Sequence, residues 1–180
     1  IAHAPGGILA YEPNLEIGTV PDELVVDLSP GEADLTCRVL DQITRQPIPN
    51  ARIDIQVMEE GKKLFGDFNF TNDSGDCLLS NLPLATYRVR AIADGYSVET
   101  KEIAVIALTA YSLDIEMEPG PSLHGEVLAN GKPVPAALVK ICTQDGWELP
   151  ATSADKEGYY SFTSVPKDLI DLTIIPRHTY

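Results

Sequence analysis

Apolar and polar residues alternate along short runs throughout the chain, and this period of two is typical of β-strands with one buried face. Such runs cover 35–41, 51–58 and 111–117, and turns rich in Gly, Pro, Asn and Asp separate them. No segment carries a convincing period of 3.6 residues. The pattern therefore predicts an all-β chain of many short strands, as in a β-sandwich.

The pattern occurs twice along the chain. The phrase that begins Pro47-Ile48-Pro49 returns as Pro133-Val134-Pro135, and a turn follows each copy, at 71–75 and at 155–158. An internal repeat of this size indicates one small β unit used in tandem. We therefore predict an N-terminal extension at 1–34, a first sandwich at 35–118, a short stiff linker at 119–121 and a second sandwich at 122–180.

The repeated residues resemble the carboxypeptidase regulatory-like domain, a transthyretin-like (prealbumin-like) β-sandwich with Ig-like architecture. The first copy matches through Leu35, Val39, Asp41, Pro47, Ala51, Ile53, Ile55, Thr71, Gly75, Leu79, Leu82, Pro83, Tyr87, Val89, Ala91, Gly95 and Tyr96. The second matches through Gly125, Val127, Pro133, Ala137, Val139, Ile141, Asp155, Gly158, Tyr160, Phe162 and Pro166. Cys37 replaces the usual Gly and Cys77 the usual aromatic residue. The resemblance implies the fold, and it says little about activity because core and turn residues carry it.

The second copy is shorter than the first. The first continues after Tyr96 through further strands at 97–117, whereas the second reaches Tyr180 at the equivalent point. We expect it to lack its last one or two strands and to expose an apolar edge. The chain could be truncated, its own residues 1–34 could cover the edge, or residues 1–34 of a neighbour could do so. The last arrangement is strand addition, which makes open chains when head meets tail.

For strand addition, the candidate residues fall at the two ends of the chain. The candidate donor positions are Ile8, Leu9, Leu15, Ile17 and Val20, and the candidate acceptor edge is Leu172, Ile174 and Tyr180.

The charge of the chain argues against two classes of binding partner. The net charge is -14 at pH 7, which disfavours binding to nucleic acid and to anionic membrane surfaces. No apolar stretch is long enough to span a bilayer. The chain begins at Ile1 without Met, as expected of a processed form or of a cloned segment. Members of the family are appendages on secreted and surface proteins, so the resemblance implies an extracellular or cell-surface location.

Motifs for catalysis are absent from the sequence. Neither a nucleophile signature nor a phosphate-binding loop occurs, and the three histidines are dispersed. The stretch 67–76 places oxygen ligands at alternate positions, but Asn72 and Leu78 stand where a calcium loop of the EF-hand type needs Gly and Glu. Ordinary Asn and Asp turn chemistry is the favoured interpretation. We predict no enzyme, no cofactor and no metal site.

Two covalent modifications are candidates. Cys37 and Cys77 fall on inward positions of two strands of the first copy, so they form either a disulfide or two buried thiols, with the thiols favoured. Asn69-Phe70-Thr71 and Asn72-Asp73-Ser74 are glycosylation sequons, and Asn72, on a turn, is the better acceptor.

The preferred functional hypothesis is a non-enzymatic extracellular structural or adhesive subunit. It would assemble with itself, into a filament or surface appendage, by β-strand addition. The alternative is a carbohydrate- or protein-binding accessory module of a larger secreted or cell-surface protein. Its contacts with surface glycans or proteins would be Trp147, which follows a hairpin turn signal, and the outward-facing Tyr159.

Overall fold

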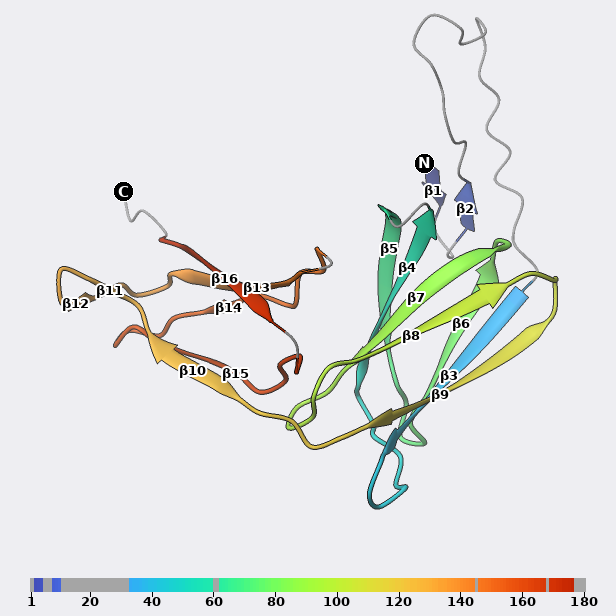
Figure 1. Cartoon of the computed structure of the whole chain (residues 1–180), viewed down its shortest axis with the longest axis horizontal. Helices are drawn as coiled ribbons and strands as arrows, with labels where there is room; N and C mark the ends of the chain where they lie inside the picture. The colour runs from blue at the N-terminus through green and yellow to red at the C-terminus, as the bar shows by residue number, and fades with distance from the viewer. Residues whose placement is uncertain are drawn as a thin grey trace, which may run out of the picture. The chain divides into compact units, whose positions relative to one another are not determined.

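The structure is a computed structural model that describes residues 2–4, 8–10, 33–59, 62–144, 146–167 and 169–176 (Figure 1). These residues form strands and turns and contain no helix, so the predicted all-β fold is confirmed. The chain folds into two compact units. Unit 1 comprises Ile1–Ala91 and Thr100–Glu116, and unit 2 comprises Ile92–Glu99 and Met117–Tyr180.

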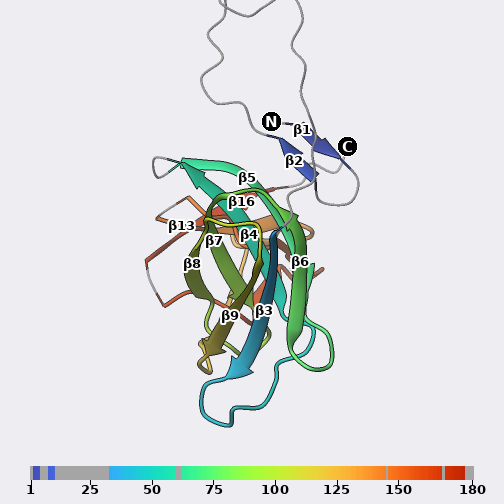
Figure 2. The ribbon, with the colours of Figure 1, turned by 90° about the vertical axis from the view of Figure 1, so that its right-hand side faces the viewer.

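Unit 1 is a sandwich of two antiparallel sheets. One sheet has the strand order β6-β3-β9 and the other the order β5-β4-β7-β8. In Figure 2, β3, β6 and β9 lie in front of β4 and β7, so the sheets form two layers. The strands are β3 (Ala33–Asp41), β4 (Arg52–Glu59), β5 (Lys62–Phe70), β6 (Asp76–Leu82), β7 (Ala85–Ile92), β8 (Glu99–Val105) and β9 (Ala110–Met117).

Alternation builds the core of unit 1. Along β3, Leu35, Cys37 and Val39 are fully buried, while the residues between them are partly or largely exposed. The facing sheet contributes its own alternating residues, and the edge strands β8 and β9 each contribute a buried residue to the core. These fully or almost fully buried side chains are Ile53, Tyr87, Val89, Ala91, Val105 and Ile115.

Unit 2 also contains two main sheets, of order β14-β13-β16 and β10-β15, beside the hairpin β11-β12. Its strands are β10 (Leu123–Glu126), β11 (Leu128–Ala129), β12 (Lys132–Pro133), β13 (Leu138–Thr143), β14 (Thr152–Ser153), β15 (Tyr159–Phe162) and β16 (Ile170–Ile175). The core is the cluster Val127, Ala137, Val139, Ile141, Leu149, Ala154, Phe162 and Val165.

Residues 92–99 pack within unit 2, although the sequence repeat assigns them to the first copy. The Gly95 N–H donates to the Thr163 carbonyl at 2.9 Å, and Ile92 and Val98 pack against the unit 2 core. Within the same unit, the Gly120 N–H donates to the Gly95 carbonyl at 3.0 Å. The predicted linker therefore makes backbone hydrogen bonds of its own in unit 2.

The repeat is visible in matching backbone hydrogen bonds. The Val39 N–H donates to the Gly75 carbonyl at 2.9 Å, and the Val127 N–H donates to the Gly158 carbonyl at 2.8 Å. Both glycines have positive φ, +75° and +85°. A Cβ on Gly75 would lie 2.6 Å from the Val39 carbonyl oxygen, and one on Gly158 would lie 2.8 Å from that of Val127. Glycine is required at both turns by conformation and by space.

The oxygen-rich turn of the first copy is built by its own side chains. Asn72 Oδ1 accepts hydrogen bonds from the N–H groups of Ser74 and Asp76, at 2.9 and 3.0 Å. In the second copy, Asp155 Oδ1 accepts from the N–H groups two and four residues later, both at 2.9 Å. This is the turn chemistry that the sequence favours over a calcium loop. Asn69 and Asn72 are both exposed, and glycosylation at either stays a prediction.

Candidate assembly site

Four strands of each unit correspond to each other by sequence. By sequence, β3, β4, β6 and β7 of unit 1 correspond to β10, β13, β15 and β16 of unit 2. In unit 1, β8 flanks β7 and β9 flanks β3. Among the described residues, β16 pairs only with β13, and β10 pairs only with β15. Each main sheet of unit 2 thus has an open edge where unit 1 has one of these two strands.

The core-facing side chains of β16 are exposed at this edge. Leu172 lies opposite Ile141, and Ile174 lies opposite Val139, in the antiparallel register of β13 and β16. Directly opposed residues point to the same face of a sheet. Because Ile141 and Val139 are fully buried, Leu172 and Ile174 face the core side, yet they are 41% and 43% exposed.

The equivalent positions in unit 1 are completely buried. The counterparts of Leu172 and Ile174 in β7 are Val89 and Ala91, and both are 0% exposed. Val105 of β8 and Ile115 of β9 are fully buried in that core. An open edge presents unpaired backbone N–H and C=O groups, and here it also presents uncovered core side chains.

The proposed donor residues lie only partly within the described structure. Ile8 and Leu9 belong to β2 (Ile8–Ala10), which pairs antiparallel with β1 (Ala2–Ala4). In that register Ile8 lies opposite Ala4, and Leu9 lies opposite His3. Of the other predicted positions, Leu15, Ile17, Val20 and Tyr180 lie outside the described residues.

Trp147 is buried, with only 4% of its surface exposed, so the interpretation of Trp147 as a ligand contact is wrong. Thr143 holds the turn: its Oγ1 accepts the Trp147 N–H at 3.1 Å, and its own N–H donates to the Trp147 carbonyl at 2.9 Å. After this turn the chain alternates, and Trp147 and Leu149 are both buried. The alternation with Leu149 was the signal in the sequence for an inward indole.

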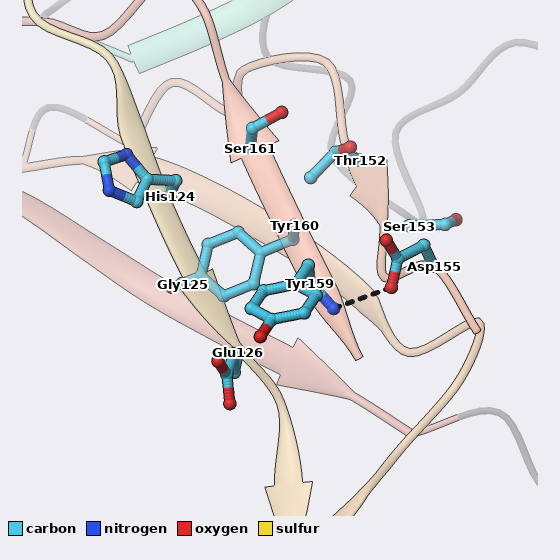
Figure 3. Close-up of a pocket in the computed structure, with 9 residues that line it drawn as sticks. All are labelled: His124, Gly125, Glu126, Thr152, Ser153, Asp155, Tyr159, Tyr160 and Ser161. Carbon is cyan, nitrogen blue, oxygen red and sulfur yellow. Dashed lines mark hydrogen bonds between the residues drawn. The ribbon is translucent and has the colours of Figure 1, made fainter. Parts of the chain in front are cut away.

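Tyr159 is 53% exposed and lines an open pocket of about 500 Å³ on unit 2 (Figure 3). Its phenol hydrogen bonds with Glu126, and this bond raises the pKa of Tyr159. Glu126 lies opposite Tyr159, and His124 lies opposite Ser161, so the four side chains share the outer face of the β10-β15 sheet. This array suits a polar ligand with hydroxyl groups. Sequence reasoning missed Glu126 and His124, because their neighbours are set by strand pairing.

Cys37 and Cys77 are free, buried thiols on adjacent strands of unit 1. They lie directly opposite each other in the register of β3 and β6. They are not bonded to each other in this structure, and a disulfide between them stays a prediction. Within the part of the chain that is described, no three His, Cys, Asp or Glu side chains are grouped so as to hold a metal ion.

Residues 34–118 match the family model of the carboxypeptidase regulatory-like domain. The matched segment, a little under half of the chain, is similar to the carboxypeptidase regulatory-like domain. The resemblance in the sequence is thereby confirmed for the first repeat, which forms most of unit 1. No curated protein matches the chain in sequence. No helix among the described residues has the length and apolar character needed to cross a membrane.

Several solved structures are similar in part. The Bacillus anthracis TIE protein is 24% identical, with a TM-score of 0.39, over 79% of this chain and 28% of that one. A streptococcal ancillary pilin is 12% identical, with a TM-score of 0.44, over 81% of this chain and 59% of that one. The shaft pilin SpaA from Lactobacillus rhamnosus GG is 14% identical, with a TM-score of 0.37, over 80% of this chain and 87% of that one. The chain thus spans 28% and 59% of the length of the first two proteins, and TM-scores this low carry no argument about its function.

Proposed function

We propose that this chain is a non-enzymatic structural subunit of an extracellular assembly, whose unit 2 is completed by strands from a neighbouring copy. The observation that carries the proposal is the open edge of β16, where core-facing Leu172 and Ile174 stay more than two fifths exposed. Covering such side chains is favourable by about 25 cal/mol per Å² of apolar surface. Strand addition would also pair the free backbone groups of the edge.

Unit 1 indicates what kind of segment would fit. The two strands of unit 1 with no counterpart among the described residues of unit 2, β8 and β9, are consecutive, and each lies at the edge of a different sheet. A single segment of the form strand–loop–strand would therefore serve both open edges of unit 2. One strand would lie beside β16 and the other beside β10. The inward positions of both strands would need to be apolar, as Val105 and Ile115 are in unit 1.

The N-terminal extension has such a sequence. Leu24, Val26 and Leu28 alternate and precede Ser29-Pro30-Gly31, just as Leu113, Ile115 and Met117 alternate and precede Glu118-Pro119-Gly120. In both places the next alternating run opens a repeat. The residues before 24 include Leu15, Ile17 and Val20, which would take the place of β8. We therefore commit to residues 15–28 of a second copy as the donor segment, since Ile8 and Leu9 already pair with β1.

Charge predicts how the assembly responds to salt. Each copy carries a net charge of -14, so two copies repel each other at low ionic strength. Raising the salt concentration screens this repulsion, whereas it leaves apolar burial intact. Association should therefore strengthen from low to moderate salt.

Sedimentation velocity over a concentration series tests the proposal. The full chain should form oligomers that grow with concentration, because a head-to-tail contact does not close. Val26→Asp in the donor and Leu172→Asp in the acceptor should each abolish growth. Leu78→Asp is the matched control, because Leu78 is 56% exposed on β6 of unit 1. It should associate like the parent chain.

Mixing the two defective variants separates the possible sources of the strand. Val26→Asp keeps an intact acceptor, and Leu172→Asp keeps an intact donor, so the mixture should form 1:1 dimers and nothing larger. A parent chain that stays monomeric at every concentration would contradict the proposal. So would a mixture that stays monomeric, because own-chain closure would then be the better account.

A second candidate function is a binding module for a polar ligand at the Tyr159 pocket. The exposed Tyr159 ring, beside Glu126 and His124, offers a surface for stacking and groups for hydrogen bonding (Figure 3). A glycan array with the full chain and with Tyr159→Ala tests it. Binding that Tyr159→Ala removes, with unchanged sedimentation, would favour the module. No binding by the parent chain would exclude it for the glycans on the array.

A further inference from the structure

At one equivalent position of the two repeats, the cross-strand pair of residues differs between unit 1 and unit 2. In unit 1, Cys37 lies opposite Cys77, and in unit 2, Gly125 lies opposite Tyr160. Two residues further along each first strand, Val39 and Val127 make the matching hydrogen bonds described above. The two pairs are therefore equivalent positions of one fold, and their contents can be compared directly.

In unit 2 the pair combines a large side chain with none. The Tyr160 ring lies over Gly125, so a Cβ on that glycine would come within 2.7 Å of the phenol oxygen. A tyrosine at this place therefore excludes a side chain on its partner. Unit 1 has two side chains of equal and modest size at the equivalent positions. Any pair of small apolar residues would fill the space, but only two cysteines can also bond covalently.

The backbone geometry suits a bond between the two sulfurs. Because the Val39 N–H donates to the Gly75 carbonyl, 39/75 is a hydrogen-bonded pair, and 37/77 is a pair of the same kind. In such pairs the Cα atoms lie about 5.5 Å apart, which is within the usual range of roughly 4.4–6.8 Å for disulfides. Both side chains face the core, at 0% and 2% exposure.

We infer that Cys37 and Cys77 are a site of oxidative cross-linking that ties β3 to β6 in unit 1. The oxidant would be a small-molecule disulfide. One cysteine thiolate attacks it, forms a mixed disulfide and releases one small thiol. The second cysteine thiolate then attacks the mixed disulfide and releases the other small thiol. Overall, two protein thiols are oxidised to one disulfide, and one small disulfide is reduced to two thiols.

Burial determines when the reaction can occur. It raises the pKa of Cys37 to about 12 and that of Cys77 to about 11, and few thiolates are then present in the folded unit near pH 7. Thiolates are the reactive form. The bond should therefore form while unit 1 folds, before β3 and β6 close over the sulfurs. Once formed, it should resist reductants until the unit unfolds.

Oxidative refolding of the full chain tests the inference. The Cys142→Ser variant removes the third cysteine, which lies in unit 2 opposite Asp171. After refolding with oxidised glutathione, iodoacetamide should modify no cysteine in the denatured protein. After refolding with a reductant, it should modify two. The Tm of unit 1 should be higher in the oxidised protein by roughly 10–30 °C.

A graft of the unit 2 pair is the matched control. The double variant Cys37→Gly with Cys77→Tyr should fold, and its Tm should not depend on the redox conditions. Two modifiable thiols after oxidative refolding would overturn the inference. An oxidised protein with the bond but with an unchanged or lower Tm would overturn it as well, because the native geometry would then be strained by the bond.

Discussion

Val89 of unit 1 and Leu172 of unit 2 hold the same place in the repeat, yet the first is fully buried and the second is 41% exposed. Both lie on the face of the sheet that points toward the core. The difference coincides with β8 and β9, which flank β7 and β3 in unit 1 and have no counterpart among the described residues of unit 2. The period of two decides which face a side chain takes, but a strand from elsewhere decides whether that face is buried.

The two units differ also in the hydrogen bonds that buried side chains make to the backbone. In unit 1, Thr71 Oγ1 donates to the Ile48 carbonyl and accepts the Ala51 N–H, both at 2.8 Å. The Tyr87 hydroxyl donates to the Pro83 carbonyl at 2.8 Å. Unit 2 has Ala154 and Ile170 at the equivalent places, and neither side chain can make these bonds. Unit 1 should therefore be the more stable unit, and unfolding should occur in two steps.

The largest effect on stability should come from removing a buried core side chain in unit 1. Ile115→Ala should lower the unfolding free energy of unit 1 by about 2–5 kcal/mol, because it leaves a cavity in a closed core. Leu172→Ala should cost unit 2 about 1 kcal/mol or less in the dilute monomer, since the side chain is already partly hydrated. Circular dichroism in urea reports both units, and the fluorescence of Trp147, the single tryptophan, reports unit 2. Equal losses of unfolding free energy in the two variants would contradict the difference in burial between the two units.

Alkaline pH should weaken unit 1 when its cysteines are reduced. Burial raises the pKa of Cys37 from 9.0 to about 12 and also raises the pKa of Tyr87. A raised folded-state pKa gives stability that is present below the unfolded value and is lost as the pH rises through the folded value. Unit 1 should thus lose a few kcal/mol, on the order of 1.4 per pKa unit, between about pH 9 and pH 12. A flat urea midpoint from pH 8 to pH 11 would argue against burial of these groups.

The two turn glycines should respond alike. Gly75→Ala and Gly158→Ala should each cost roughly 2 kcal/mol, because the added Cβ meets a carbonyl oxygen in a left-handed backbone. The two urea transitions report the losses separately. A loss in one unit alone would show that the turns are not equivalent.

The smallest expected effect is a gain. Ala136 has a φ of +57°, and its counterpart Asn50 has a φ of +55°. Alanine adopts this region at a higher cost in free energy than asparagine does, so Ala136→Gly should stabilise unit 2 by about 0.5–1 kcal/mol. Asn50→Gly should change unit 1 by a few tenths only. Trp147 fluorescence in urea measures the stability of unit 2 in Ala136→Gly. Destabilisation by this substitution would contradict the claim that the backbone at Ala136 is strained.

Local patterns predicted much of the fold. The alternation of Leu35, Cys37 and Val39 predicted a strand and its buried face, and the Pro47 and Pro133 phrases predicted the repeat. Turn chemistry at Asn72 followed from residue type. These features depend on neighbours in the sequence, so the sequence alone sufficed.

Features that depend on strand pairing could not be predicted. The sequence predicts that Cys37 and Cys77 point inward, but their direct opposition and the array of Glu126 with Tyr159 both require the register between strands. The packing of residues 92–99 in unit 2 requires a tertiary contact that no local pattern encodes. The burial of Trp147, by contrast, follows from its alternation with Leu149, because the preceding turn signal does not say which face the next residues bury.

Hydrogen exchange of β16 and β10, measured by mass spectrometry over a concentration series, tests the central claim most directly. In dilute solution, the amides at the open edges should exchange fast, while those of β7 and β3 in unit 1 stay protected. At high concentration, β16 and β10 should become protected, and Val26→Asp should prevent this. Protection of β16 at every concentration would mean that the edge is covered within one chain, and rapid exchange at every concentration would mean that no strand is added.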